Sequence, residues 1–206
     1  LLPKFGIATT VVDGRDLANW EAAIRPETKV FFFETPANPT MEVLDLKAIC
    51  GLARSHGITS VVDNAFATPV LQRPLELGAD VVAYSATKMM DGQGRVMAGA
   101  VCGSEEFIEH TLLKFIRNTG PTLAPFNAWV VLKGLETLDL RIRRQSDNAL
   151  KVAQFLEARV DRVNYPGLPS SPSHDLAMSQ MEMVGPILSL HVGEGRARAH
   201  ALLDAL

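Results

Sequence analysis

The chain of 206 residues lacks most of the features that mark membrane, nucleic-acid and metal-binding proteins. Its net charge is −3 and it has no polybasic run, so the positive patch needed to bind nucleic acid or an anionic membrane is missing. No apolar run approaches the roughly 18 residues of a membrane-spanning helix. Cys50 and Cys102 are the only cysteines and have no metal-ligand spacing, so we expect reduced, inert core thiols, no metal and a cytoplasmic location.

An initiator methionine is also missing, and the amphipathic helical pattern from Ala197 to Leu206 simply stops. We therefore expect the chain to be a piece of a longer protein. Its length and its 47% hydrophobic content suffice for one sizeable domain and part of another. The Pro- and Ser-rich stretch 166–173 is the expected boundary region. We assign residues 1–160 to a large domain and residues 161–206 to the start of a smaller one.

Strand and helix patterns alternate along the chain, which predicts an α/β fold with a mostly parallel sheet. Apolar runs predict strands, the first of them buried on both faces, at residues 29–34, 58–63, 79–85 and 98–102, with further strands at 160–165 and 187–192. Helical spacing predicts helices from a cap at Asp45 to Gly57, near 74–77, at 105–117, and over 124–159 as one bent helix or two.

Polar residues follow three of these strands. Asn38 comes after the first, Asp63 ends the second, and Ser85, Thr87 and Lys88 lie at the end of the third. Ligands of open α/β sheets collect at the carboxyl ends of the strands, so these side chains are predicted to face one cleft. A lysine amine and a carboxylate are what pyridoxal phosphate (PLP) needs: one forms an imine with its aldehyde, and the other keeps its ring nitrogen protonated.

Structural roles remain as alternatives for each of these residues. A lysine at a strand end can extend into solvent, and Asp, Ser and Thr often cap turns. Asn38 precedes a proline and can be a turn residue.

Four ordered motifs carry a resemblance to a known family. They are ETPANPT at 34–40, VDNAFATP at 62–69, LQRPLELGAD at 71–80 and YSATK at 84–88. Together they resemble the Cys/Met metabolism family of fold-type I PLP-dependent enzymes. Two softer motifs, DGQGRV at 91–96 and GPTLAPFNAW at 120–129, are most similar to its O-succinylhomoserine sulfhydrylase branch.

The resemblance implies a role for each site residue. Lys88 would carry PLP and move protons, Asp63 would pair with the ring nitrogen, and Ser85 and Thr87 would bind the phosphate. Asn38 would hydrogen-bond the ring oxygen. Independently of the resemblance, Arg95 follows Lys88 closely in the chain, so its cation is expected to meet a substrate carboxylate or succinyl group, with an ordinary surface arginine as the alternative. Asn38 is also expected to contact the substrate.

The implied fold is the PLP-binding large domain plus the start of an α+β small domain. The implied reaction is γ-replacement on O-succinylhomoserine or O-acetylhomoserine with sulfide, giving homocysteine in methionine biosynthesis. Cystathionine γ-synthase, γ-lyase or methionine γ-lyase activity is the alternative. Family members are commonly tetramers built from dimers. The family's upstream phosphate loop and stacking tyrosine and its downstream carboxylate-binding arginine cannot be placed here, so an inactive fragment is a further alternative.

Overall fold

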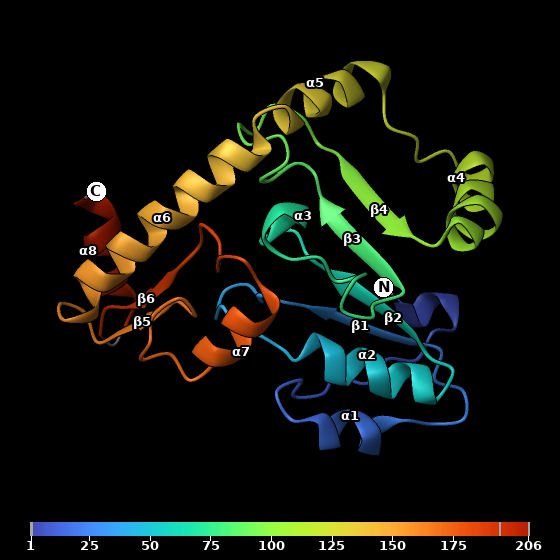
Figure 1. Ribbon diagram of the computed structural model, residues 1–206, viewed down its shortest axis with the longest axis horizontal. Coiled ribbons are helices and arrows are strands. Elements are labelled where there is room, and N and C mark those ends of the chain that lie inside the picture. The colour runs from blue at the N-terminus through green and yellow to red at the C-terminus, as the bar shows by residue number, and fades with distance from the viewer. Residues whose placement is uncertain (1, 194, 206) are drawn as a thin grey trace.

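A four-stranded sheet forms the centre of the protein (Figure 1). The structure is a computed structural model, and it describes residues 2–193 and 195–205. The strands are β1 (Val30–Glu34), β2 (Thr59–Asp63), β3 (Val81–Ser85) and β4 (Gly99–Gly103). They lie in the order β1-β2-β3-β4, with β1, β2 and β3 parallel and β4 antiparallel to β3. The predicted α/β fold with a mostly parallel sheet is confirmed.

Helices and a small second sheet surround these strands. The helices are α1 (Leu17–Ala23), α2 (Leu46–Ser55), α3 (Thr68–Leu71), α4 (Leu113–Thr119), α5 (Pro125–Leu135), α6 (Leu138–Glu157), α7 (His174–Gln180) and α8 (Arg196–Asp204), with a 3₁₀ turn at Leu2–Phe5 and a π-helix at Phe107–Leu112. Strands β5 (Arg162–Asn164) and β6 (Ser189–His191) pair antiparallel. Within the described residues, no helix is both long and apolar enough to cross a membrane.

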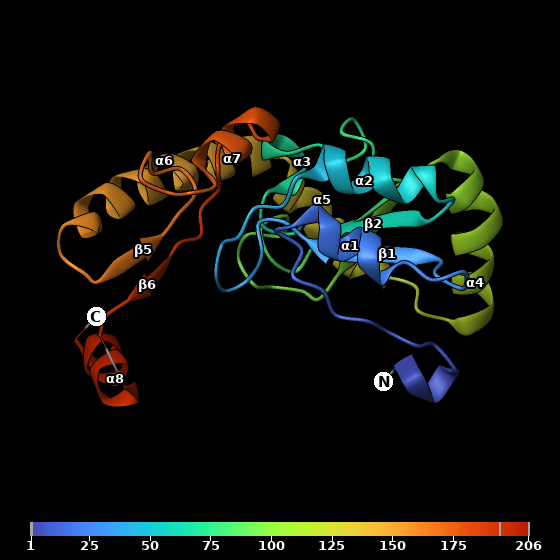
Figure 2. The same ribbon diagram turned by 90° about the horizontal axis from the view of Figure 1, so that it is seen from below.

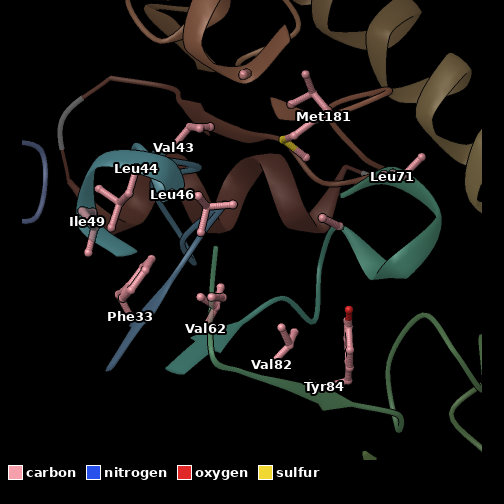
Figure 3. Packing of buried hydrophobic residues seen from close by; sticks show 14 of the residues in the cluster. Phe33, Val43, Leu44, Leu46, Ile49, Val62, Leu71, Val82, Tyr84 and Met181 are labelled. Carbon is pink, nitrogen blue, oxygen red and sulfur yellow. The ribbon is translucent and has the colours of Figure 1, made fainter. Parts of the chain in front are cut away.

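Helix α2 covers one face of the sheet. The Asp45 side chain accepts a hydrogen bond of 2.9 Å from the Ala48 backbone N–H, which confirms the predicted cap. Buried Leu46 and Ile49 then recur at helical spacing. Figure 3 shows these side chains on the same side of the strands as Phe33, Val62 and Val82. We call this side the covered face.

The opposite side of β1 is exposed. Side chains alternate between the two faces of a strand, so Val30, Phe32 and Glu34 point away from α2. Val30 is 51% exposed and Phe32 is 65% exposed. The expectation that this strand is buried on both faces is therefore wrong, because within the described residues no element packs over Phe32. We call this side the open face.

Helix α6 connects the sheet to the β5–β6 ribbon, as Figure 2 shows from the side. Its buried stripe includes Leu138, Ile142 and Ala153. Tyr165, directly after β5, is buried, and its hydroxyl donates to the Gly185 carbonyl oxygen at 2.9 Å. Residues 166–173 form turns. The predicted long helix at 124–159 is two helices, one of the two alternatives considered.

Three local predictions need correction. Residues 74–77 form a turn closed by hydrogen bonds to the Pro74 carbonyl oxygen, and the short helix is α3, just upstream. The predicted helix at 105–117 begins as a π-helix and continues as α4 to Thr119. Cys50 is a core thiol as expected, but Cys102 is exposed because it lies on an edge strand. Leu206, the predicted end of the last helix, lies outside the described residues.

Candidate active site

The carboxyl ends of β1 and β2 bring two acidic side chains together. Glu34 and Asp63 are register partners in the parallel ladder, and both follow the alternation that points toward the open face. The Thr35 N–H donates to the Asp63 carbonyl oxygen at 3.4 Å, which continues the ladder beyond β1. The backbone pairing therefore places the two carboxyl groups side by side.

Asp63 is half-buried and partly engaged by its own loop. Its Oδ1 accepts a hydrogen bond of 3.0 Å from the Ala65 backbone N–H. This turn directs the chain toward Phe66, and it is the capping role considered for Asp63 above. One oxygen in a turn leaves the other available to a ligand.

Lys88 lies in the turn that follows β3. Its backbone N–H donates to the Ser85 carbonyl oxygen at 3.2 Å, and its Nζ lies 4.8 Å from the centroid of the Phe66 ring. An ammonium above an aromatic face gains about 0.5–1 kcal/mol at exposed sites. Phe66 is itself buried, so it forms a fixed apolar wall beside the lysine amine.

The charges of Asp63 and Lys88 both influence the pKa of the Glu34 carboxyl. Burial raises the pKa of the Glu34 carboxyl above its usual value, and the negative charge of Asp63 adds to this rise. A hydrogen bond from the Asn38 backbone N–H and the positive charge of Lys88 act in the opposite direction on the same pKa.

The two predicted phosphate ligands differ in their hydrogen bonds. The Ser85 hydroxyl, at the end of β3, has no hydrogen bond within the described residues. The Thr87 hydroxyl donates to the Ala98 carbonyl oxygen at 3.2 Å and accepts from the Ala98 N–H at 2.9 Å. Thr87 therefore joins the end of β3 to the start of β4, and it would have to exchange the Ala98 carbonyl for a phosphate oxygen to donate to one.

Arg95 forms a separate pair with Asp91. The Arg95 Nε donates to Asp91 Oδ1 at 2.8 Å, and the Arg95 backbone N–H donates to Asp91 Oδ2 at 2.7 Å. Burial alone would raise the pKa of Asp91, but the hydrogen bonds from Arg95 outweigh it and leave this pKa below its usual value. The Asp91 side chain is fully buried while that of Arg95 is 38% exposed. The pair holds the Arg95 side chain in place, with the part of the guanidinium that faces away from Asp91 toward solvent.

The structure thus gathers some of the predicted residues more closely than others. Asp63 lies beside Glu34 in the ladder, Ser85 follows the alternation of β3 to the same face, and Lys88 lies in the turn after β3. The Asn38 side chain is exposed, and Arg95 is held by Asp91. Sequence reasoning missed Glu34 as a site residue, although its position at a strand end was a usable signal.

Solved structures place the fold in a known class. Cystathionine gamma-lyase from Lactobacillus plantarum, solved in complex with L-serine, superposes with a TM-score of 0.92 at 37% identity, covering 95% of this chain and 52% of that one. The metB protein of Corynebacterium glutamicum gives a TM-score of 0.85 at 39% identity, covering 88% of this chain and 48% of that one. The fold is thus that of PLP-dependent enzymes of this type.

The sequence places the chain within a family. The profile of the family described as Cys/Met metabolism PLP-dependent enzyme matches residues 1–206, and the chain belongs to this family. The O-succinylhomoserine sulfhydrylase of Pseudomonas aeruginosa is 48% identical over 204 residues, which are 98% of this chain and 50% of that protein. The L-methionine gamma-lyase of Porphyromonas gingivalis is 43% identical over the whole chain and 52% of its own length. The chain spans about half the length of these relatives.

The side chains at the carboxyl ends of β2 and β3 fit PLP chemically. Lys88 supplies the primary amine, and within the part of the chain that the structure describes Asp63 keeps one carboxylate oxygen, and Ser85 its hydroxyl, without a hydrogen-bond partner. Buried Phe66 supplies an apolar wall. These are the groups that a cationic ring, an aldehyde and a phosphate require.

Proposed function

We propose that the whole protein replaces the acyl group of O-succinylhomoserine, or of O-acetylhomoserine, with sulfide to give homocysteine, a step of methionine biosynthesis. In this reaction the bond between Cγ and the acyl oxygen breaks, a bond between Cγ and sulfur forms, and the acyl group leaves as its carboxylate. No oxidant or reductant is needed. The observation that carries the proposal is the position of Asp63 at the carboxyl end of β2 and of Lys88 in the turn after the parallel neighbour β3.

Each residue has a role in this proposal. PLP, when bound, supplies an electron sink for the carbanions formed at Cα and Cβ of the substrate. Lys88 holds the cofactor and then moves protons between the substrate carbons. The Asp63 carboxylate keeps the ring nitrogen protonated, Ser85 and Thr87 hold the phosphate, and Asn38 donates to the ring oxygen.

Arg95 is proposed as the residue that recognises the acyl group. Asp91 fixes its Nε, so the outer guanidinium edge is pre-oriented. A succinyl carboxylate would pair with this edge, whereas an acetyl group has no charge to offer. Arg95→Gln should therefore raise KM for O-succinylhomoserine by about tenfold, the value of one charge-assisted hydrogen bond, and change KM for O-acetylhomoserine little.

A second candidate reaction is γ-elimination, as the names of the related methionine gamma-lyases indicate. Product analysis distinguishes the two. The protein is incubated with O-succinylhomoserine plus sulfide, and separately with methionine or cystathionine alone. Homocysteine formed only in the first mixture supports replacement, whereas α-keto acid and ammonia from the other mixtures would contradict it.

We also propose a cytoplasmic homo-oligomer, a dimer of dimers, for the whole protein. Exposed apolar side chains on α5 support an interface: Phe126 is 67% and Trp129 55% exposed, with ring centroids 6.0 Å apart. The division into residues 1–160 and 161–206 remains a prediction. Sedimentation of the full-length protein, with Trp129→Glu as the variant, tests the interface.

A further inference from the structure

The turn that carries Lys88 is held by a side chain from a distant helix. Arg141, in the first turns of α6, donates from Nη1 to the Met89 carbonyl oxygen at 3.0 Å and from Nη2 to the Met90 carbonyl oxygen at 3.1 Å. These carbonyls belong to the two residues directly after Lys88. The guanidinium therefore contacts the reactive lysine's own turn, 52 positions away in sequence.

The same guanidinium is fixed on its other side. Its Nη2 also donates to the Gly134 carbonyl oxygen at 2.8 Å, and its Nε donates to the Thr137 hydroxyl at 3.0 Å. Gly134 and Thr137 form the corner between α5 and α6. Arg141 thus ties the turn after Lys88 to this corner through a planar group with fixed donor directions.

Two glycines make this close approach possible. A Cβ on Gly92 would lie 2.0 Å from Arg141 Nη1, and a Cβ on Gly134 would lie 2.4 Å from the Met90 carbonyl oxygen. Gly92 also has a φ of +74°, which disfavours other residues. The backbone of the turn after Lys88 is in direct contact with the corner between α5 and α6. The turn therefore has little room to move while Arg141 is in place.

The role of Arg141 differs from that of the arginine two positions on. Arg143 donates to the carboxylates of Asp139 and Glu182, at 2.8 and 2.9 Å, near the surface. Arg141 has no carboxylate partner within the described residues and donates to backbone carbonyls and one hydroxyl. Hydrogen bonds from a charged donor contribute about 1.5–3 kcal/mol each, so this arrangement strongly favours one position of the turn.

We propose that Arg141 is a positioning residue for Lys88, holding the Met89 and Met90 carbonyls so that the lysine amine stays beside the Phe66 ring. This inference rests on the proposed role of Lys88 in holding PLP. A displacement of about 1 Å at a reacting group can cost about 100-fold in rate, so the effect should fall on the proton transfers rather than on substrate binding.

The test compares Arg141→Gln and Arg141→Lys with Arg144→Gln in the full-length holoenzyme. Arg144 is exposed on the same helix, so its variant removes the same charge without touching the turn. The readouts are kcat and KM, and the rate at which PLP added to the apo-protein becomes fixed to Lys88 by borohydride, located by peptide mass spectrometry. Circular dichroism establishes that each variant is folded.

We expect Arg141→Gln to lower kcat and the attachment rate by about 10- to 100-fold with KM within about threefold, because the turn is free to shift. Arg141→Lys should recover only part of the lost kcat and attachment rate, because an ammonium group cannot donate to both carbonyl oxygens in the same plane. Folded variants that match Arg144→Gln in both readouts would refute the role. Failure of both Arg141 variants to fold would also refute it, because Arg141 would then be structural.

The outcome is separable from that of the proposed function. If the wild-type protein does not attach PLP at Lys88, the proposed function fails before Arg141 is tested. If it attaches PLP but releases no homocysteine, the reaction assignment fails, while the comparison of attachment rates still tests Arg141.

Discussion

The two faces of the central sheet differ in how far they bury side chains of the same type. Phe31 and Phe32 are neighbours in β1, yet Phe31 is 6% exposed on the covered face and Phe32 is 65% exposed on the open face. Phe31 packs against Trp20 of α1 with ring centroids 4.9 Å apart. The covered face therefore supplies stability, whereas the open face carries the charged groups of the candidate site.

This division has a physical cause. Charged side chains lose hydration when they are buried, so a site with Glu34, Asp63 and Lys88 needs a face with access to water or to a ligand. The covered face is filled by α2 and has no such access. Substitutions on the two faces should consequently separate activity from stability.

The largest effect is expected at Lys88, on the open face. Lys88→Ala should lower activity by more than about 1,000-fold and abolish borohydride fixation of PLP to the chain, because the amine that holds the cofactor is gone. The measurements are turnover and peptide mass spectrometry. Lys29→Ala is the control, since Lys29 is exposed at the opposite end of β1. PLP still fixed at the original peptide in the Ala variant would be incompatible with our assignment.

The pair Phe31 and Phe32 tests the division directly. Phe31→Ala should reduce the free energy of unfolding by about 3–5 kcal/mol, because it removes a buried ring and leaves a cavity. Phe32→Ala should change it by less than about 1 kcal/mol, since the ring is already largely in water. Urea unfolding of both variants gives the comparison. Equal losses would mean that another part of the full-length protein covers Phe32.

Tyr165, which is buried in the core, should make the stability of the protein depend strongly on pH. Burial raises the pKa of Tyr165 to about 12 from an ordinary value of 10.0, so its contribution is complete below pH 10 and is lost as the pH rises toward 12. The loss amounts to about 3 kcal/mol over this range. Tyr165→Phe should flatten the alkaline part of the curve measured by urea unfolding at several pH values. An unchanged alkaline slope would contradict the assignment.

The smallest effect is expected at Glu34, on the open face. Burial and the Asp63 charge raise its pKa above 4.5, so its favourable contribution is present below pH 4.5 and is lost as the pH rises through the folded-state value. Glu34→Gln should thus stabilise the protein at neutral pH, by less than about 1 kcal/mol, while keeping an oxygen for the Asn38 N–H. Thermal melts at pH 4 and pH 7 measure this, with exposed Glu105→Gln as control. Destabilisation at pH 7 relative to that control would contradict it.

The local pattern was sufficient for much of the fold. The apolar runs located β1, β2 and β3, because a strand of this length with β-branched and aromatic residues has few alternatives. Asp45 was identifiable as a cap because its carboxylate satisfies a free N–H at the helix start. Asn38, Asp63 and Lys88 were predicted as site residues because parallel strands present their carboxyl ends at one edge, and this assignment stays a prediction.

Other features were not accessible from local pattern. The stretch after α3 contains one proline, Pro74, which is compatible with either a turn or a helix start, and hydrogen bonds to the Pro74 carbonyl oxygen show that it is a turn. Phe32 belongs to the same apolar run as Phe31, and their burial differs because helices pack on only one face of the sheet, where Trp20 of α1 contacts Phe31.

The amino-acid sequence by itself therefore determined the strands, the cap of α2 and the order in which the site residues meet the sheet edge, since these depend on interactions between near neighbours. The tertiary structure alone decided which face is open, that the Glu34 and Asp63 carboxyl groups lie side by side, and that Arg141 contacts the turn after Lys88. These depend on contacts between residues far apart in the chain, and neither periodicity nor propensity encodes the partner of such a contact.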